Sequence, residues 1–418
     1  MTSRDQQPAH TQPAPRITVI GCDGRPPPPA AAKALQTAEL VVGAPRHLDS
    51  APPGAERLEI KRLGDALDAI CASPGPVAVL ASGDPGFFGI VRALRARGVR
   101  PAVFPAVSSV ALAFARLGLD WDDALVVSAH GRAPRHALAA ALAHPKVAIL
   151  TAPATARELA TDLVAAGRTV YAAECLGTPH EQVRDLTANP HGDLADPNIL
   201  VSLEHTAHTE HAPEHPAPPR WLAGHQGAPP GWALPEDQFA HRDSMITKAE
   251  IRALVLARLA PAPGRIIWDI GAGSGSVAVE CARFGAHVIA VESDPAQCAR
   301  IRENAARHGV QLHVQEGRAP EALKTLPPAD AVFIGGGDRT VVEAAVRAAT
   351  PDRVVITLAA VQRVGETADL LTALGYHPEG VQLQASRLAP LPNGTFRLAA
   401  ENPVFVLHAR RATIGEQS

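Results

Sequence analysis

One segment near the middle of the chain constrains the fold more than any other. Residues 266–276 read IIWDIGAGSGS, an apolar run that leads into a glycine-rich turn, and a helical pattern follows at once over Val277–Phe284. Glycines suit such a turn because it takes unusual backbone angles and lets a ligand approach the main chain closely. The segment predicts a Rossmann-like α/β domain with a ligand site at Gly271, Gly273, Gly275 and Ser276.

Two acidic residues near that turn favour one class of ligand. Asp269 precedes the glycine-rich loop by two residues, where a carboxylate would repel a pyrophosphate. The next predicted strand, His287–Glu292, ends about twenty residues later in a carboxylate that can accept hydrogen bonds from both ribose hydroxyls. These features favour S-adenosylmethionine over a dinucleotide. Nicotinamide and flavin enzymes use related loops, and a structural turn beside a surface glutamate is the competing interpretation.

Two further turns follow predicted strands of the same region. Arg318 and Ala319 come after the predicted strand Gln311–Gln315 and are expected to border the adenine. Gly335 and Gly336 come after Ala331–Ile334, where the transferred methyl group would emerge, although a merely flexible turn is the alternative. Carboxyl ends of parallel strands are where open α/β sheets bind ligands. Three more strands are expected in this region, at Arg353–Leu358, Gly380–Ala385 and Val404–His408.

The order of three segments gives a longer match. Residues 241–252 (HRDSMITKAEIR), 269–276 and 333–337 together resemble the class I methyltransferase fold. More narrowly, residues 241–410 resemble the decarboxylating precorrin methyltransferase domain of cobalamin synthesis. The resemblance implies that the segment containing Thr247 precedes the first core strand and lines the cofactor cleft.

The first half shows a second α/β pattern, because short apolar runs alternate with Ala/Leu-rich stretches. A His- and Pro-rich tract at 204–240 separates it from the second half, so we predict domains at 16–203 and 241–410 with tails at 1–15 and 411–418. The tract carries His205, His208, His211 and His215, but no acidic or cysteine partner fixes a geometry, and we expect no metal site. The predicted strands are Ile17–Ile20, Leu40–Val42, Val77–Leu80, Leu125–Ser128, Val147–Leu150 and Ile199–Leu203.

Three motifs of the first half are informative because of the order in which they follow one another along the chain. They are Ala81–Gly89, with Gly83, Asp84 and Pro85; Pro105–Val110, with Ser108 and Ser109; and Ser128–Arg132, with His130. Each alone could be an ordinary turn. In this order they resemble the tetrapyrrole methylases (class III methyltransferases), in their precorrin-6Y branch. The resemblance implies two lobes with S-adenosylmethionine folded between them, contacted by Gly83–Pro85 and Ser108–Ser109, and His130 near the substrate.

One departure from that family concerns the end of the first strand. The family usually has a G-x-G-P-G turn there, and this chain has Gly21–Arg25, which reads GCDGR. Because this turn differs, an alternative stays open in which the first half binds a tetrapyrrole but methylates it only weakly.

Both halves together resemble enzymes that methylate a precorrin-6 macrocycle at carbons 5 and 15 and decarboxylate an acetate side chain. The resemblance implies one S-adenosylmethionine site in each domain. No general base stands out, and Asp84 and His130 are candidates by position only. The substrate carries many carboxylates, so some arginines could act as clamps; the candidates are Arg46, Arg132, Arg242 and Arg339. The cobalt-containing precorrin is the alternative substrate.

Composition argues against other classes of partner. A net charge of -3 and 4% aromatic residues do not suit a nucleotide or RNA methyltransferase, which needs a basic face. The five cysteines are scattered, which indicates a reducing cytoplasm rather than a disulfide framework. No apolar run approaches the roughly 20 residues that cross a bilayer. We therefore expect a cytoplasmic homo-oligomer that acts on a small tetrapyrrole, with no nucleic-acid or membrane partner.

Overall fold

A computed structural model describes residues 16–129, 133–151, 153–196, 198–204, 229, 231–242 and 246–412. The expected tail at 1–15, the candidate His130 with Arg132, the four linker histidines and residues 413–418 lie outside this described part. The chain divides into two compact units; one comprises Met1–Trp121, Leu150–Arg157 and Tyr171–Val201, and the other Asp122–Ile149, Glu158–Val170 and Ser202–Ser418. The domain boundaries predicted from the sequence stay a prediction.

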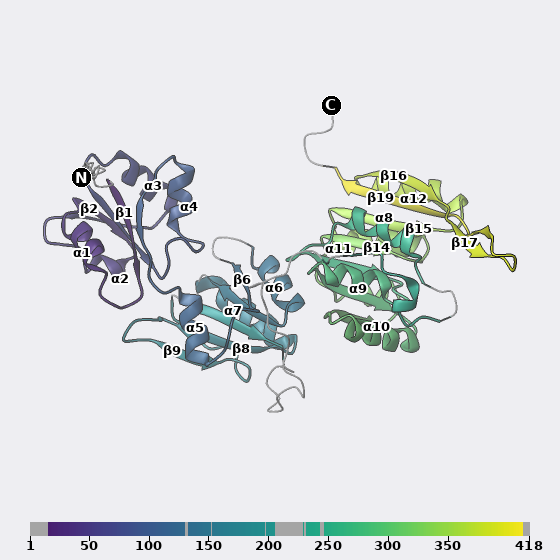
Figure 1. The fold of residues 1–418 in the computed structure, drawn as a ribbon, viewed down its shortest axis with the longest axis horizontal. Coiled ribbons are helices and arrows are strands. Elements are labelled where there is room, and N and C mark those ends of the chain that lie inside the picture. Colours follow the sequence, from purple (N-terminus) through teal and green to yellow (C-terminus); the bar gives the residue numbers. More distant parts are fainter. Residues whose placement is uncertain are drawn as a thin grey trace, which may run out of the picture. The chain divides into compact units, whose positions relative to one another are not determined.

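The first sheet is parallel and has helices on both faces (Figure 1). Its order is β3-β2-β4-β1-β5. Apolar residues of α1 and α2 pack on one face, and those of α3 and α4 on the other. The elements are β1 (Ile17–Cys22), α1 (Pro29–Gln36), β2 (Leu40–Gly43), α2 (Pro45–Leu48), β3 (Glu56–Glu59), α3 (Leu63–Ala72), β4 (Val77–Ser82), α4 (Ile90–Ala96) and β5 (Ala102–Phe104).

A second five-stranded sheet has the order β6-β7-β10-β8-β9, in which β8 and β9 are antiparallel. Its strands account for the remaining predicted strands of the first half and add β8 and β9. The hydroxyl of Ser108 caps α5 by accepting from the Ala111 amide at 3.1 Å. The elements are α5 (Ser109–Leu117), β6 (Leu125–Ser128), α6 (Pro134–Ala143), β7 (Lys146–Leu150), α7 (Pro153–Ala165), β8 (Thr169–Glu174), β9 (Gln182–Asp185) and β10 (Asn198–Leu203).

The second half folds around a seven-stranded sheet of order β13-β12-β11-β14-β15-β19-β16. Strands β11 to β15 are parallel, and β19 runs antiparallel to both of its neighbours. The elements are η2 (Glu236–Gln238), α8 (Ala249–Leu259), β11 (Ile266–Ile270), α9 (Ser276–Arg283), β12 (His287–Glu292), α10 (Pro295–Arg307), β13 (His313–Glu316), η3 (Glu321–Leu323), β14 (Ala331–Ile334), α11 (Arg339–Ala349), β15 (Arg353–Leu358), α12 (Gln362–Ala373), β16 (Tyr376–Leu383), β17 (Ser386–Pro390), β18 (Phe396–Ala400) and β19 (Val404–Arg411).

The central strand β11 shows why this sheet is covered on both faces. Its side chains alternate, so Ile266, Trp268 and Ile270 pack with α11 and α12, while Ile267 packs with α8 and α9. Strand order runs one way from β11 through β12 to β13 and the other way through β14 to β15. The helices that follow β11 and β14, α9 and α11, cover opposite faces of the sheet, and a crevice at that switch point is where open α/β sheets bind ligands.

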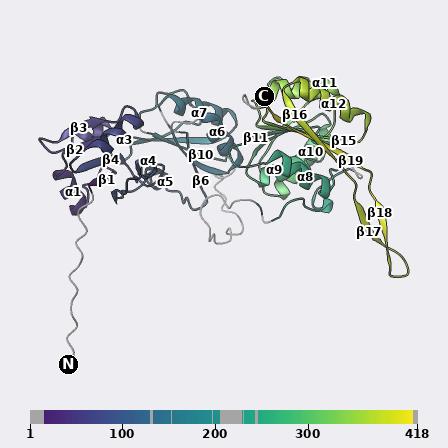
Figure 2. The same cartoon turned by 90° about the horizontal axis from the view of Figure 1, so that it is seen from above.

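Two expectations for the end of the chain need correction. The strand expected at Gly380–Ala385 lies earlier, at Tyr376–Leu383, because β16 pairs along its whole length with β19. The hairpin of β17 and β18 was not expected. It extends away from the seven-stranded sheet (Figure 2) and leaves Leu388, Phe396 and Leu398 exposed. No helix among the described residues is long and apolar enough to span a bilayer.

Candidate active sites

A cavity of about 410 Å³ lies at the carboxyl edge of the seven-stranded sheet, in the size range of small-molecule sites. It is formed by the residues that follow four neighbouring strands, β11, β12, β13 and β14. Five of the predicted cofactor residues line it: Gly271, Glu292, Arg318, Ala319 and Gly336. Residues from separate parts of the sequence thus meet as predicted, since parallel strands end at one edge of a sheet.

The glycine-rich loop keeps its main chain open toward this cavity. Gly271, Gly273 and Gly275 all have positive φ, at 70°, 57° and 76°. A Cβ atom on Gly335 would lie 3.1 Å from the Gly271 carbonyl oxygen, so the loops after β11 and β14 approach each other closely. A Cβ atom on Gly336 would meet nothing within 4 Å, which leaves room beside its backbone for a ligand. These conformations explain the glycines that the sequence places there.

The carboxylate of Glu292 is held by backbone amides on two sides. One oxygen accepts from the Gly273 amide at 2.9 Å. The other accepts from the amides of Ser293 and Asp294 at 2.8 and 3.0 Å. A carboxylate oxygen has two lone pairs, so the group still has acceptor capacity for a ligand. Glu292 is half-buried and lines the cavity.

Asp269 takes a different place from the one a ligand contact needs. Its side chain is 1% exposed and lies beneath the loop rather than among the cavity residues. One carboxylate oxygen accepts from the Ala278 amide in the first turn of α9 at 2.9 Å, and the other has no partner among the described residues. Burial raises the pKa of Asp269 to about 7. The geometry therefore gives this carboxyl a role in holding the loop against α9.

The remaining predicted residues of this half, Ser276 and Thr247 among them, do not line the cavity. Ser276 is buried as the first residue of α9, and the Thr247 carbonyl accepts from Arg252 at 2.5 Å. Sequence reasoning missed Asp338 and Thr340, which follow Gly337 in the chain and line the cavity. Asp338 accepts from the Val341 amide at 3.1 Å and so caps α11. An aspartate that precedes a helix after a glycine run is the signal that could have identified it.

In the first half, three chain segments meet at the carboxyl ends of β1, β4 and β5. A Cβ atom on Gly21 would lie 2.5 Å from the Gly83 carbonyl oxygen and 2.6 Å from the Ala106 nitrogen. Gly83 itself has a φ of 63°, and its Cβ would lie 3.1 Å from the Ser109 nitrogen. The predicted segments Gly83–Pro85 and Ser108–Ser109 are therefore neighbours, and both abut the altered turn.

Side chains at this edge largely bond within the protein. Asp84 accepts from the Gly86 amide at 2.8 Å, and Ser108 caps α5. Asp23, in the altered turn, accepts from the Val107 amide at 3.2 Å and from the Arg25 guanidinium at 2.5 Å. That ion pair lowers the pKa of Asp23. These bonds leave main-chain groups as the parts of this edge most open to a ligand.

Two family models match the chain. One, described as tetrapyrrole (corrin/porphyrin) methylases, matches residues 28–189, and one described as precorrin methyltransferase domain matches residues 237–408. The precorrin-6Y C(5,15)-methyltransferase [decarboxylating] of a Sinorhizobium species is 37% identical over 338 residues, which cover 76% of this chain and 77% of the relative. The chain belongs to the precorrin-6Y C(5,15)-methyltransferase (decarboxylating) family. It is therefore a methyltransferase, as the sequence indicated.

Two further comparisons concern smaller proteins. The probable cobalt-precorrin-6B C(15)-methyltransferase (decarboxylating) of Pyrobaculum calidifontis is 31% identical over 191 residues, which cover 44% of this chain and 96% of the relative. The solved C-terminal domain of precorrin-6Y C5,15-methyltransferase from Rhodobacter capsulatus is 31% identical, with a TM-score of 0.39; the match covers 43% of this chain and 97% of that chain. The predicted pairing of a tetrapyrrole methylase domain with a class I methyltransferase domain is confirmed.

Membership of this methyltransferase family implies use of S-adenosylmethionine, and the second-half cavity fits it. The glycine-lined walls at Gly271 and Gly336 leave the main chain open, and the Glu292 carboxylate provides an acceptor for hydroxyl groups. Arg318 and Ala319 form the adjoining wall. Size, acceptor and open backbone are the features that a nucleoside with an amino-acid tail requires.

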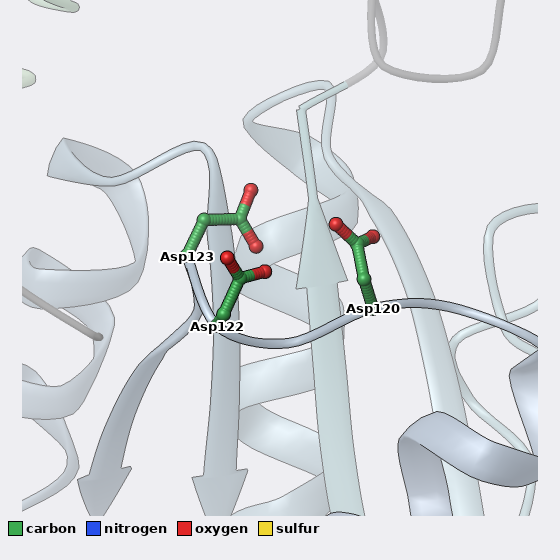
Figure 3. Close-up of side chains that lie close together, drawn as sticks. All are labelled: Asp120, Asp122 and Asp123. Atoms are coloured by element: carbon green, nitrogen blue, oxygen red, sulfur yellow. The ribbon is translucent and has the colours of Figure 1, made fainter. Parts of the chain in front are cut away.

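An acidic cluster lies apart from these residues. The carboxylates of Asp120, Asp122 and Asp123 approach within 4.8 Å of one another (Figure 3). A Lys146 nitrogen lies 2.7 Å from one oxygen of Asp123 and offsets part of the charge. Acidic groups of this kind are common at surfaces without an ion, so we assign no metal site here.

Proposed function

We propose that this chain transfers methyl groups to carbons 5 and 15 of a precorrin-6 macrocycle and removes carbon dioxide from an acetate side chain. The observation that carries the proposal is the 37% identity with a precorrin-6Y C(5,15)-methyltransferase [decarboxylating] over 76% of the chain. The two separate family matches support one methyl-transfer site in each half. Two active sites, one for each reactive carbon of the macrocycle, explain the two matches better than a single site in which the substrate is repositioned.

We assign methylation of carbon 15 and decarboxylation to the second half. Glu292 would accept a hydrogen bond from a ribose hydroxyl, the Gly271 and Gly336 backbones would lie against the donor, and Arg318 and Ala319 would border the adenine. When bound, S-adenosylmethionine supplies an electrophilic methyl group on a sulfonium. The residues then have to align that group with the substrate carbon, and alignment alone can supply much of the rate.

We assign methylation of carbon 5 to the first half, with Gly83–Pro85 and Ser108–Ser109 as the donor-binding segments. The close approach of Gly21 to Gly83 and Ala106 supports a shared ligand edge at these strand ends. Asp23 fixes the Val107 amide and so holds the altered turn against the serine segment. The turn therefore retains a defined structure, which favours an active site over a passive tetrapyrrole-holding module.

We assign no general base in the described part of either site. The ionisable residues that line the cavity are Glu292, Arg318 and Asp338. Backbone amides engage the two carboxylates, and an arginine side chain offers hydrogen-bond donors but no acceptor for a proton. Asp84, the described candidate of the first half, bonds to its own turn. The proposal thus rests on positioning, with binding of the substrate carboxylates by arginines.

Mass spectrometry of the product tests the proposal. The full chain is incubated with S-adenosylmethionine and metal-free precorrin-6, and in parallel with its cobalt-containing form. We expect a gain of two methyl groups and a loss of one carbon dioxide from the metal-free substrate. A product only from the cobalt form would move the proposal to that substrate. No mass change with either substrate, despite donor binding, would contradict it.

A further inference from the structure

One face of α10 lies directly beneath the glycine-rich loop. Cys298, Ile301 and Asn304 follow one another at three-residue intervals and are all fully buried. The Cys298 thiol lies 3.5 Å from the Glu292 carbonyl oxygen. Carbons of Ile301 would lie 3.0 Å from a Cβ atom on Gly275. This helix face is therefore in contact with the loop and with the end of β12 that carries Glu292.

Asn304 uses its whole amide group at this contact. Its nitrogen donates to the Ser274 carbonyl at 2.8 Å and to the Ala240 carbonyl at 2.9 Å. Its oxygen accepts from the Ala240 amide at 2.7 Å. A buried amide with these partners is costly to replace, because each lost bond leaves a desolvated polar group. One side chain thus joins the glycine-rich loop to a segment more than thirty residues earlier in the chain.

That earlier segment, residues 231–242, is called the strap here. Phe239 is 2% exposed and packs with Val279 and Ala305. The Glu280 carboxylate accepts from the strap amides of Ala233 and Leu234 at 2.7 and 2.9 Å. The strap is therefore packed onto α9 and α10 and can serve as a fixed support for Asn304.

The position of Ser274 connects this support to the cavity. The preceding residue, Gly273, donates its amide to the carboxylate of Glu292. The Ser274 carbonyl and the Gly273 amide belong to adjacent residues of the loop, so a bond that restrains the carbonyl also restrains the amide. Asn304 thus bonds to the residue next to the one whose amide holds Glu292 at the cavity wall.

We propose that Asn304 is a positioning residue for the methyl donor in the second half, acting through Ser274 and Gly273 on Glu292. The inference rests on the proposed function, because it assumes that the donor occupies this cavity. A role limited to stability would lower the unfolding temperature and leave donor affinity unchanged well below it.

Two variants and one control test this in the full chain. Asn304→Leu removes all three hydrogen bonds, and Asn304→Asp keeps the acceptor for Ala240 but loses both donors. The control is His308→Ala, since His308 Nε2 lies 3.1 Å from the Gln238 carbonyl oxygen of the strap and bonds to no described loop residue. Calorimetry with S-adenosylhomocysteine is expected to show about tenfold weaker binding at one class of sites for both Asn304 variants. The control is expected to bind like the wild-type protein.

Kinetics give a second readout. We expect the KM for S-adenosylmethionine in carbon-15 methylation to rise about tenfold in Asn304→Asp, with kcat at saturating donor largely retained. Unchanged affinity and KM in folded Asn304 variants would overturn the inference. An equal loss of donor affinity in the His308→Ala control would also overturn it. Contact of α10 with the strap, and not the bond from Asn304 to the loop, would then explain the loss. If the wild-type protein itself binds no donor in this half, the proposed function fails instead.

Discussion

At the scale of single residues, the carboxylate of Glu292 is central to the second-half cavity. Three backbone amides hold its carboxylate, so its orientation is fixed before any ligand arrives. Preorganisation of this kind lowers the entropic cost of binding. The same bonds show how an acidic residue at the end of β12 holds the glycine-rich loop.

Replacing this carboxylate should weaken donor binding in the second half. Glu292→Gln turns one acceptor into a donor that faces backbone amides and removes the charge. Because hydrogen bonds to charged groups contribute about 1.5–3 kcal/mol, we expect the Kd for S-adenosylhomocysteine to rise by about tenfold or more. Calorimetry on the full chain measures it. The matched control is Glu303→Gln on the exposed side of α10, and an equal loss there would contradict the assignment.

Asp269 should make the stability of the second half depend on pH. Burial raises the pKa of this carboxyl from 3.8 to about 7. A raised pKa in the folded state favours the protonated form, so its stabilising contribution is complete below about pH 4 and is lost as pH rises through about 7. Asp269→Asn cannot lose this proton and should become more stable relative to the wild-type protein as pH rises.

Urea unfolding of both proteins at about pH 5 and about pH 8 measures that difference. The expected result is a larger advantage for Asp269→Asn at the higher pH. The same difference in midpoint at both values would show that the carboxyl titrates alike in the folded and unfolded states.

At the scale of elements, the sequence predicted the strands that show an apolar pattern within a few consecutive residues. β11, β12 and β14 are apolar runs that end in glycine or acidic residues, and each was placed within one residue of its observed bounds. β3 reads Glu-Arg-Leu-Glu and so has no apolar run, and the apolar β5 has only three residues, so neither shows the pattern by which β11, β12 and β14 were recognised. β16 was misplaced because its register depends on β19, which follows it by more than twenty residues.

The same distinction holds for the site. Gly271, Gly336 and Glu292 follow from local strand-turn patterns, and the structure brings them to one cavity. The burial of Asp269 beneath the loop and the bond from Asn304 to Ser274 depend on tertiary packing between helices and loop. No spacing in the sequence encodes those contacts, so sequence reasoning gave Asp269 a ligand role and left Asn304 unnoticed.

The strap is anchored by a fully buried ion pair, which gives a prediction at this scale. Arg252 donates to Glu280 at 2.6 Å, and its guanidinium lies 4.8 Å from the centre of the Phe239 ring. Removing Arg252 leaves the buried Glu280 carboxylate with only the longer ion pair to Arg283 at 3.7 Å, so Arg252→Met should lower the free energy of unfolding by about 3 kcal/mol. The double variant Arg252→Met, Glu280→Gln should recover part of this loss. Chemical denaturation checks both, and a double variant less stable than Arg252→Met alone would contradict the explanation.

At the scale of the whole molecule, two folds with different sheet orders occur in one chain of a family that methylates two carbons. The first has a five-stranded parallel sheet with its candidate donor segments after β4 and β5, and the second has a seven-stranded sheet with its cavity around β11 and β14. Neither depends on residues of the other for the groups assigned to it. Each site should therefore be separable by substitution within the full chain. The expected homo-oligomer stays a prediction.

The most direct test of two independent sites is the mass of the product formed by one variant per half. Gly83→Val places a branched side chain at a positive φ against the Ser109 backbone, and Glu292→Gln alters the second-half cavity. With precorrin-6, and S-adenosylmethionine at a concentration near the wild-type Kd, we predict that each folded variant adds mainly one methyl group in the time in which the wild-type protein adds two. Only Glu292→Gln should also retain the carbon dioxide. Failure of either folded variant to add any methyl group would contradict the account. Addition of two methyl groups by both variants would contradict it as well.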